Sequence, residues 1–188
     1  FLAAASSGGA EPRRLAAMRT ALDEHRARVG TFLSGVMQSS IAATYGRMRK
    51  WDDAIRCVED GIESTRDRLE RIAEAELWRL RGELLIGKAR SRQRSRARPA
   101  ALLPDAQQSF ARALDIASEQ GARAWTLRTR MSLARHTASG PQRSEALAEL
   151  ARVYESFTEG FDTPDLIDAK ALLERAQHPN SVRFQAAD

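Results

Sequence analysis

One stretch of the sequence nearly spells a nucleotide-binding motif. Residues 82–89, GELLIGKA, match the phosphate-binding loop pattern GxxxxGK[ST] except at Ala89, where the pattern needs a hydroxyl group for Mg²⁺. The chemistry also needs a flexible glycine-rich loop after a strand, whose backbone N–H groups surround the phosphates. Helix-forming residues separate Gly82 from Gly87, and the preceding segment is predicted to be helical. We therefore interpret the match as coincidental and expect no cofactor.

The other side chains that could carry catalysis or bind a metal are isolated. His25, His136 and His178 lie far apart and show no paired ligand spacing. Cys57 is the single cysteine, which rules out an intrachain disulfide and suits a reducing compartment. No apolar run approaches the ~18 residues of a membrane span. We predict a cytoplasmic chain that is not itself an enzyme, holds no metal and has no membrane partner.

An arginine-rich run, KARSRQRSRAR, occupies residues 88–98 and carries six of the positive charges behind the net charge of +5. Outside this run the chain is close to neutral, so its basic character is local. The run has no aromatic residue, so a nucleic-acid contact would be electrostatic, non-specific and sensitive to salt. The plainer interpretation is a solvated loop inserted between two helices. The candidate nucleic-acid contacts are Arg90, Arg92, Arg94, Arg96 and Arg98.

The elements that would position these residues follow from an internal repeat. Small residues recur at spacings that fit a period of 40, with a 12-residue insertion in the central copy. Such self-similarity indicates stacked supersecondary units. Small side chains allow antiparallel helices to approach closely, and large neighbours fill the remaining space. The recurring small residues are Ala42, Gly82 and Ala134 in the first helix of each unit, and Ala54, Ala106 and Ala146 in the second.

The central copy resembles the tetratricopeptide repeat, a unit of two helices about 34 residues long. The resemblance is carried by Trp78, Gly82, Leu85, Ala106, Phe110 and Ala113, although Arg81 occupies a position where the family usually has Leu. It implies an all-α fold, a right-handed α-solenoid of antiparallel helix hairpins. A C-terminal helix would cap the stack.

The predicted organisation is one elongated repeat domain over residues 12–177. Residues 1–11 are expected to be a linker or a remnant of a preceding helix, and residues 178–188 a loose tail. The N-terminal half-repeat lacks its partner helix and is a candidate for self-association. The predicted parts are the half-repeat 12–28, the repeats 30–66, 69–120 and 122–158, the basic insertion 88–103 and the capping helix 163–177. Within the second repeat, the first helix is expected to run from Leu69 to Gly87.

Three segments are also similar to the C-terminal repeat region of large bacterial multidomain regulators. They are AELWRLRGELL (75–85), RAWTLRTRMSLAR (123–135) and VYESFTEGFDTPDLIDAKALL (153–173). The resemblance covers roughly residues 12–176. It implies a sensor or scaffold module, with a signal-transduction ATPase domain and a DNA-binding or cyclase domain upstream of Phe1.

In the tetratricopeptide family, peptides bind in a groove lined by the first helix of each pair. The matching positions around the small residues predict a partner-binding groove at Glu76, Arg79, Glu83, Arg128 and Arg135. Arginine suits carboxylates on a partner. We therefore expect a scaffold or sensor module that binds a protein, a peptide, an effector or other domains of its parent protein. The alternative is non-specific nucleic-acid binding through residues 88–98.

Overall fold

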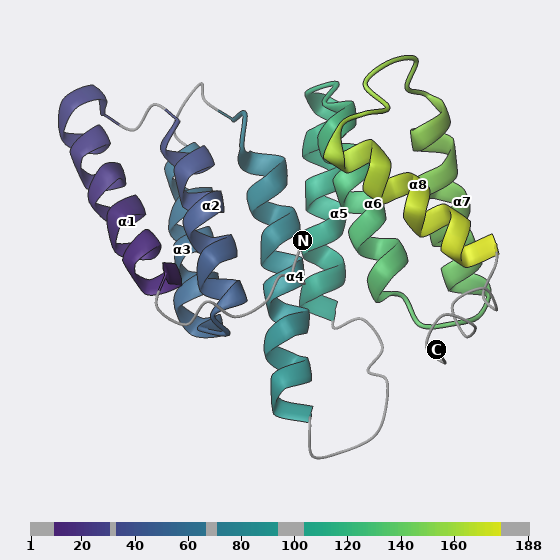
Figure 1. The fold of residues 1–188 in the computed structure, drawn as a ribbon, viewed down its shortest axis with the longest axis horizontal. Helices are drawn as coiled ribbons and strands as arrows, with labels where there is room; N and C mark the ends of the chain where they lie inside the picture. The colour runs from purple at the N-terminus through teal and green to yellow at the C-terminus, as the bar shows by residue number, and fades with distance from the viewer. Residues whose placement is uncertain (1–9, 31–32, 67–70, 94–103, 178–188) are drawn as a thin grey trace. The chain divides into compact units, whose positions relative to one another are not determined.

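The computed structural model describes residues 10–30, 33–66, 71–93 and 104–177, and these residues form helices and turns with no strand (Figure 1). The predicted all-α class is confirmed. The helices are α1 (Ala10–Val29), α2 (Ser34–Arg47), α3 (Trp51–Arg66), α4 (Glu74–Gln93), α5 (Pro104–Glu119), α6 (Arg123–His136), α7 (Pro141–Glu155) and α8 (Pro164–Gln177). None of them combines the length and the apolar character that crossing a membrane would require.

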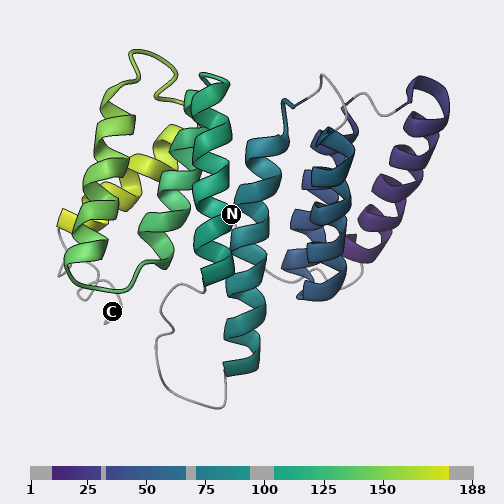
Figure 2. The same cartoon turned by 180° about the vertical axis from the view of Figure 1, so that it is seen from behind.

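Within the span predicted as one repeat domain, contacts gather into two compact units. Unit 1 is Phe1–Ile116 and unit 2 is Ala117–Asp188, so the boundary falls inside α5. Figures 1 and 2 show from opposite sides that consecutive helices of unit 1 run antiparallel. In unit 1, α2 packs on α1, α3 and α4, and α3 also packs on α4.

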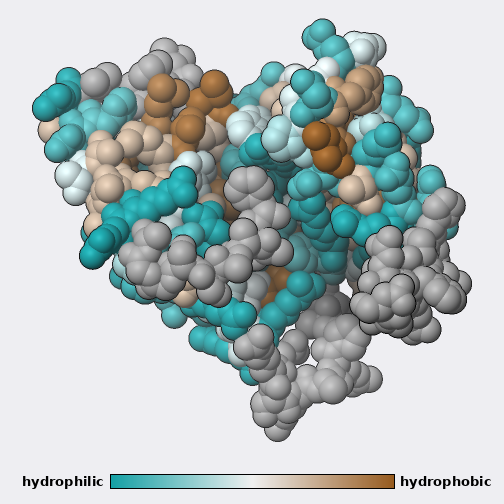
Figure 3. Space-filling view, viewed as in Figure 1, coloured by the Kyte–Doolittle hydropathy of each residue, from teal (hydrophilic) through white to brown (hydrophobic). Residues whose placement is uncertain are grey.

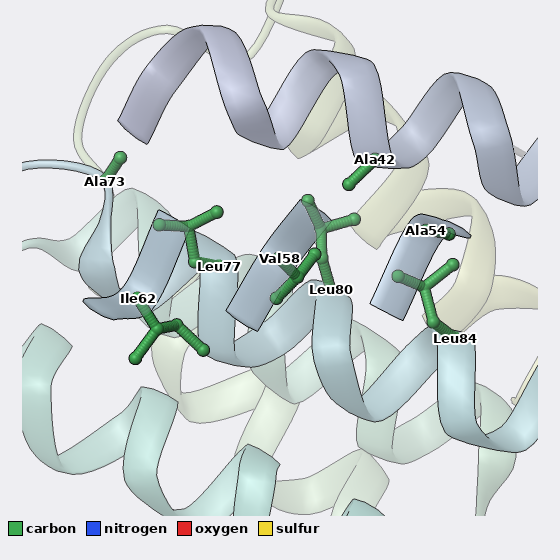
Figure 4. Close-up of a cluster of buried hydrophobic side chains, with 8 residues drawn as sticks. All are labelled: Ala42, Ala54, Val58, Ile62, Ala73, Leu77, Leu80 and Leu84. Atoms are coloured by element: carbon green, nitrogen blue, oxygen red, sulfur yellow. The ribbon is translucent and has the colours of Figure 1, made fainter. Parts of the chain in front are cut away.

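The main core of unit 1 fills the space between α2, α3 and α4 (Figure 4). Along α3 and α4 its members recur every three or four residues, so on each of these helices they share one face. Val58 and Leu77 are wholly buried in this core, as are the small side chains of Ala42 and Ala54. A second cluster, which includes Leu15, Leu22 and Ile41, joins α1 to α2. Burial of these apolar faces provides the main favourable contribution to folding of the unit.

Two glycines of α4 allow other helices to approach closely. A Cβ built on Gly82 would lie 2.7 Å from the Cε1 atom of Phe110 on α5, and one built on Gly87 would overlap the Trp51 ring on α3. Phe110 is wholly buried and occupies the position that Val58 and Leu150 occupy in the other predicted copies, where burial is equally complete. The predicted close crossing of α4 and α5 is thus present.

Unit 2 is built from α6, α7 and α8. Leu127, Leu150 and Leu166 are buried where these three helices meet, and α8 packs on both α6 and α7. Ala146 packs against this core but is partly exposed, whereas Ala54 and Ala106 are fully buried in unit 1. The third predicted copy is therefore less tightly enclosed at this position.

The predicted helix ends are largely confirmed. Gly121 follows α5 with φ +61°, a conformation that favours glycine, and the N–H of Ala122 donates to the carbonyl of Ala117 at 2.8 Å. Pro164 begins α8, and Asp165 lies in its first turn, near the positive end of the helix dipole. Helix α1 begins at Ala10, two residues before Pro12.

The expected bounds of α4, Leu69 to Gly87, are wrong at both ends. The helix begins at Glu74 rather than Leu69, and it continues beyond Gly87 to Gln93, so residues 88–93 of the predicted basic loop are helical. Trp51 packs against Gly87 and Asp52 pairs with Lys88, and both contacts hold this extension against the start of α3. Cations are also favoured in the last turn of a helix. Residues 94–103, most of the predicted linker 1–11 and the predicted tail 178–188 lie outside the described residues.

Candidate functional site

Three of the predicted groove residues form one ion cluster on α4. The guanidinium group of Arg79 binds Glu76 through two nitrogens, Nε to Oε2 at 2.7 Å and Nη2 to Oε1 at 2.8 Å. Its Nη1 reaches Oε1 of Glu83 at 3.5 Å. Spacings of three and four residues bring these side chains together on one helix face. They are largely buried, with 14% of the Arg79 side chain exposed, so this is not an ordinary solvated helix face.

The other two predicted groove residues contact α8. Arg128 Nε donates to Asp165 Oδ2 at 2.7 Å, and its guanidinium group also stacks over the Trp125 ring at 5.0 Å. Arg135 Nη2 lies 3.5 Å from Asp168 Oδ2. The carboxylates that these arginines bind therefore come from the C-terminal helix of the same unit.

The five predicted residues thus fall into two sets, one in unit 1 and one in unit 2. Each set already makes ion pairs inside its own unit. A partner that bound them would have to replace those ion pairs, which lowers the expected gain in binding free energy. Neither set is the strongest candidate site.

The segment that resembles a phosphate-binding loop lies entirely within α4. Its backbone N–H groups belong to the helix, so residues 82–89 do not form the loop that the motif requires. Among the residues that the structure describes, no group of three or more His, Cys, Asp or Glu side chains is arranged to hold a metal ion. The prediction that this segment is helical is confirmed.

A cleft in unit 1 was not predicted from the sequence. It has a volume of about 290 Å³ and lies between α1, α2 and α3. Leu22 and Ile41 provide buried apolar surface, and Tyr45 and Cys57 add polar atoms. The charged lining residues are Arg19, Asp23 and Arg26 from α1, and Asp53, Arg56 and Asp60 from α3. The cleft therefore presents both charge signs beside an apolar floor.

Arg26 is the residue with the most unusual environment in this cleft. Its Nη2 lies 3.2 Å from the side-chain oxygen of Gln38 when that amide is oriented to satisfy its neighbours, and the same oxygen accepts from the N–H of Gly61 at 3.1 Å. Gln38 is only 2% exposed. The Nε of Arg26 is buried and has no hydrogen-bond acceptor among the described residues. A buried donor of this kind favours an added acceptor, such as a ligand carboxylate.

Some of the other polar groups of the cleft already have partners. Arg19 Nη1 donates to the hydroxyl of Tyr45 at 3.4 Å, which links α1 to α2. Arg56 pairs with Asp53 at 3.2 Å on a well-exposed part of α3. Such an exposed pair contributes little to stability and is readily rearranged by a ligand. Asp23 and Asp60 provide negative charge on opposite sides of the cleft.

Cys57 lines the cleft as a protonated thiol. The pKa of Cys57 is raised from 9.0 to about 11, mainly by burial and also by the Asp60 carboxylate, and Arg26 and Arg19 partly offset the rise. Its Sγ lies 3.6 Å from the backbone carbonyl of Gln38, to which the thiol donates. Because the thiolate is the nucleophilic form, this environment does not activate the cysteine.

A signal for the cleft was present in the sequence. Arg19, Asp23 and Arg26 recur at spacings of four and three residues, and Asp53, Arg56 and Asp60 recur at spacings of three and four. Each set therefore lies along one face of its helix. The sequence does not show that these two charged faces lie on either side of α2, because that depends on how the helices pack.

No family model, curated protein or solved structure matches this chain.

Proposed function

We propose that the chain is a non-catalytic helical module that binds a protein or effector segment through the cleft between α1, α2 and α3. The observation that carries this proposal is the cleft itself, whose lining includes Arg26, with its buried Nε, and the carboxylates of Asp23 and Asp60. The ligand would present a carboxylate to Arg26 and Arg19 and a cationic group to Asp23 or Asp60.

The size of the cleft favours a peptide segment over a whole cofactor. Pockets that enclose small molecules usually have volumes of about 300–1,000 Å³. At about 290 Å³, this cleft accommodates one or two side chains of a longer ligand. A mixed-charge segment of a protein partner, or of another domain of the parent protein, fits these limits best.

We further propose that the helix pairs stack as a right-handed, tetratricopeptide-like solenoid within a larger bacterial regulator. The resemblance of residues 75–85, 123–135 and 153–173 to such regulators supports this context. The close crossing at Gly82 and Phe110 also supports it, because the repeat pattern requires a small residue against a large one there. In this context the chain would supply recognition, and upstream domains would supply the output.

The cleft is a better candidate than the predicted groove residues because the groove charges already form ion pairs with one another or with α8. Glu76, Arg79 and Glu83 bind one another, and Arg128 and Arg135 bind α8. In the cleft, by contrast, the Nε of Arg26 is desolvated without receiving an acceptor in return. A ligand carboxylate would supply that acceptor without breaking an existing ion pair.

The test is retention of the purified chain on an array of short peptides in four classes: acidic, basic, mixed-charge and neutral. We expect the mixed-charge class to retain the chain, and we expect Arg26→Gln and Asp60→Asn to reduce retention. Arg112→Gln, on the exposed face of α5, is the control with the same charge change as Arg26→Gln. Equal retention by all four classes, or by the variants and the wild type, would contradict a cleft that recognises mixed charge.

A further inference from the structure

Four helix ends of unit 1 gather at one end of the unit. Glu11 in the first turn of α1 pairs with Arg47 in the last turn of α2, with Oε1 and Nε 3.3 Å apart. Asp52 in the first turn of α3 pairs with Lys88 near the end of α4. Because consecutive helices are antiparallel, the start of α1, the turn between α2 and α3, and the end of α4 share this end (Figure 1).

Six exposed cations lie on these same segments, and we call them the basic end. Within the described residues none of the six makes an ion pair. Glu11, Asp52 and Asp53 on these segments pair with Arg47, Lys88 and Arg56, which are outside the set of six. The basic end therefore keeps a net positive charge, although Arg92 also interacts electrostatically with Asp52. Its members are Arg13 and Arg14 on α1, Arg49 and Lys50 in the α2–α3 turn, and Arg90 and Arg92 on α4.

We propose that the basic end binds the phosphate backbone of double-helical nucleic acid, without reading its sequence. This surface is distinct from the cleft, so the proposal does not depend on the cleft. It also differs from binding by the arginine run alone, because four of the six cations come from α1 and the α2–α3 turn. The helical extension of α4 holds Arg90 and Arg92 on the same end as the other four cations.

The span of the basic end suits a duplex. Packed helices lie about 8–10 Å apart, so α1 and α4, joined through α2, are separated by about 20 Å. Double-helical DNA carries one charge per about 1.7 Å of its axis, which gives about a dozen phosphates over that length. About half of them face any one side of the duplex, which is enough for six cations.

The surface chemistry favours a duplex over a membrane. Membrane-surface binding usually combines basic residues with an adjacent apolar face. The large apolar side chains exposed in unit 1, Leu33, Val36 and Ile72, lie at the starts of α2 and α4, at the opposite end. Figure 3 shows hydrophobic surface over those starts, whereas the visible surface at the basic end is mainly hydrophilic.

The aromatic chemistry also favours phosphates over unpaired bases. Proteins that bind single strands usually stack bases on exposed aromatic rings. At the basic end, the ring of Trp51 packs against Gly87 of α4 and is only partly exposed. The contacts available there are electrostatic.

The test measures the affinity of the full chain for a mixed-sequence DNA duplex of about 20 bp between about 50 and 200 mM salt. Six phosphate contacts predict a slope of log affinity against log salt of about −5. The triple variant Arg49→Gln, Lys50→Gln, Arg90→Gln is expected to make this slope shallower by about 3. The triple variant Arg28→Gln, Arg112→Gln, Arg175→Gln removes the same charge from exposed positions that are not members of the basic end and should leave the slope unchanged.

A charge-conserving triple variant, Arg49→Lys, Lys50→Arg, Arg90→Lys, should keep the wild-type slope, and helical circular dichroism should be the same for every variant. The proposal is overturned if the triple variant at Arg49, Lys50 and Arg90 and the control at Arg28, Arg112 and Arg175 change the slope equally. It is also overturned if binding falls only in a third triple variant, Arg94→Gln, Arg96→Gln, Arg98→Gln, because the arginine run alone would then be responsible. Preferential binding to phosphatidylserine vesicles, with no retention of the duplex, would overturn it in favour of a membrane surface.

Discussion

The ring of Phe110 lies directly over Gly82, so that a Cβ at Gly82 would meet its Cε1 atom at 2.7 Å. Phe110 is wholly buried, and its ring therefore has little room to move aside. The contact joins α4 to α5 and is where the repeat pattern placed a small residue against a large one. It is the most direct link between the spacing in the sequence and the packing in unit 1.

Gly82→Ala is expected to destabilise the protein despite the better helix propensity of alanine. Overpacking a buried site costs about 1–3 kcal/mol, and alanine recovers at most about 1 kcal/mol. We predict a net loss of up to about 2 kcal/mol in the free energy of unfolding, measured by urea titration. In the double variant with Phe110→Leu, the two changes should be less damaging than their sum. Strict additivity would show that the two residues do not touch.

Arg81 on α4 connects three helices. Its Nη1 donates to Ser109 Oγ on α5 at 2.8 Å, and its Nε pairs with Glu59 on α3 at 3.1 Å. We predict that Arg81→Gln lowers the free energy of unfolding by about 1–2 kcal/mol, because a hydrogen bond from a charged donor to a buried hydroxyl is lost. Arg112→Gln, on the exposed face of α5, should change it by less than about 0.5 kcal/mol. Equal effects of the two variants would contradict this role.

The pair between Arg128 and Asp165 should contribute little, although it joins α6 to α8. About a third of each side chain is exposed, at 37% and 34%. Exposed pairs usually contribute about 0.2–1 kcal/mol, so a double-mutant cycle with Arg128→Gln and Asp165→Asn should give a coupling energy in that range. Leu172→Ala, in the buried interface of α8, should cost about 2–4 kcal/mol. A coupling energy larger than the loss at Leu172 would show that charge, rather than apolar packing, holds α8.

The sequence predicted the helices better than it predicted the site. The helix pairs and the burial of Val58, Phe110 and Leu150 follow from small and large residues at helical spacing, which is a local pattern. The true end of α4 was missed because it depends on contacts between Trp51 and Gly87 and between Asp52 and Lys88, some 36 residues apart in the sequence. The cleft was missed for the same reason, since its charged faces come from separate helices.

Cys57 should react slowly with a thiol reagent in the native protein. Raising its pKa from 9.0 to about 11 reduces the thiolate fraction near pH 8 by about 100-fold relative to the unfolded chain. The pKa of Cys57 is higher in the folded than in the unfolded state. The protonated thiol therefore makes its full contribution to stability below about pH 9, and this contribution is lost as the pH rises toward about 11. The reduced thiolate fraction is measured by the alkylation rates of Cys57 with and without urea, corrected for the effect of urea on the reagent itself. Native and unfolded rates that agree would contradict a buried, protonated thiol.

The central claim is that the cleft between α1, α2 and α3 binds a carboxylate-bearing segment through Arg26. The most direct measurement is the dissociation constant, by titration calorimetry, of a mixed-charge peptide retained on the array, for wild type, Arg26→Gln and Arg28→Gln. The two substitutions remove the same charge from the same helix, but Arg28 is exposed and does not line the cleft. Loss of a charged hydrogen bond of about 1.5–3 kcal/mol predicts at least about 10-fold weaker binding for Arg26→Gln and unchanged binding for Arg28→Gln. Equal affinities for the two variants would contradict the claim.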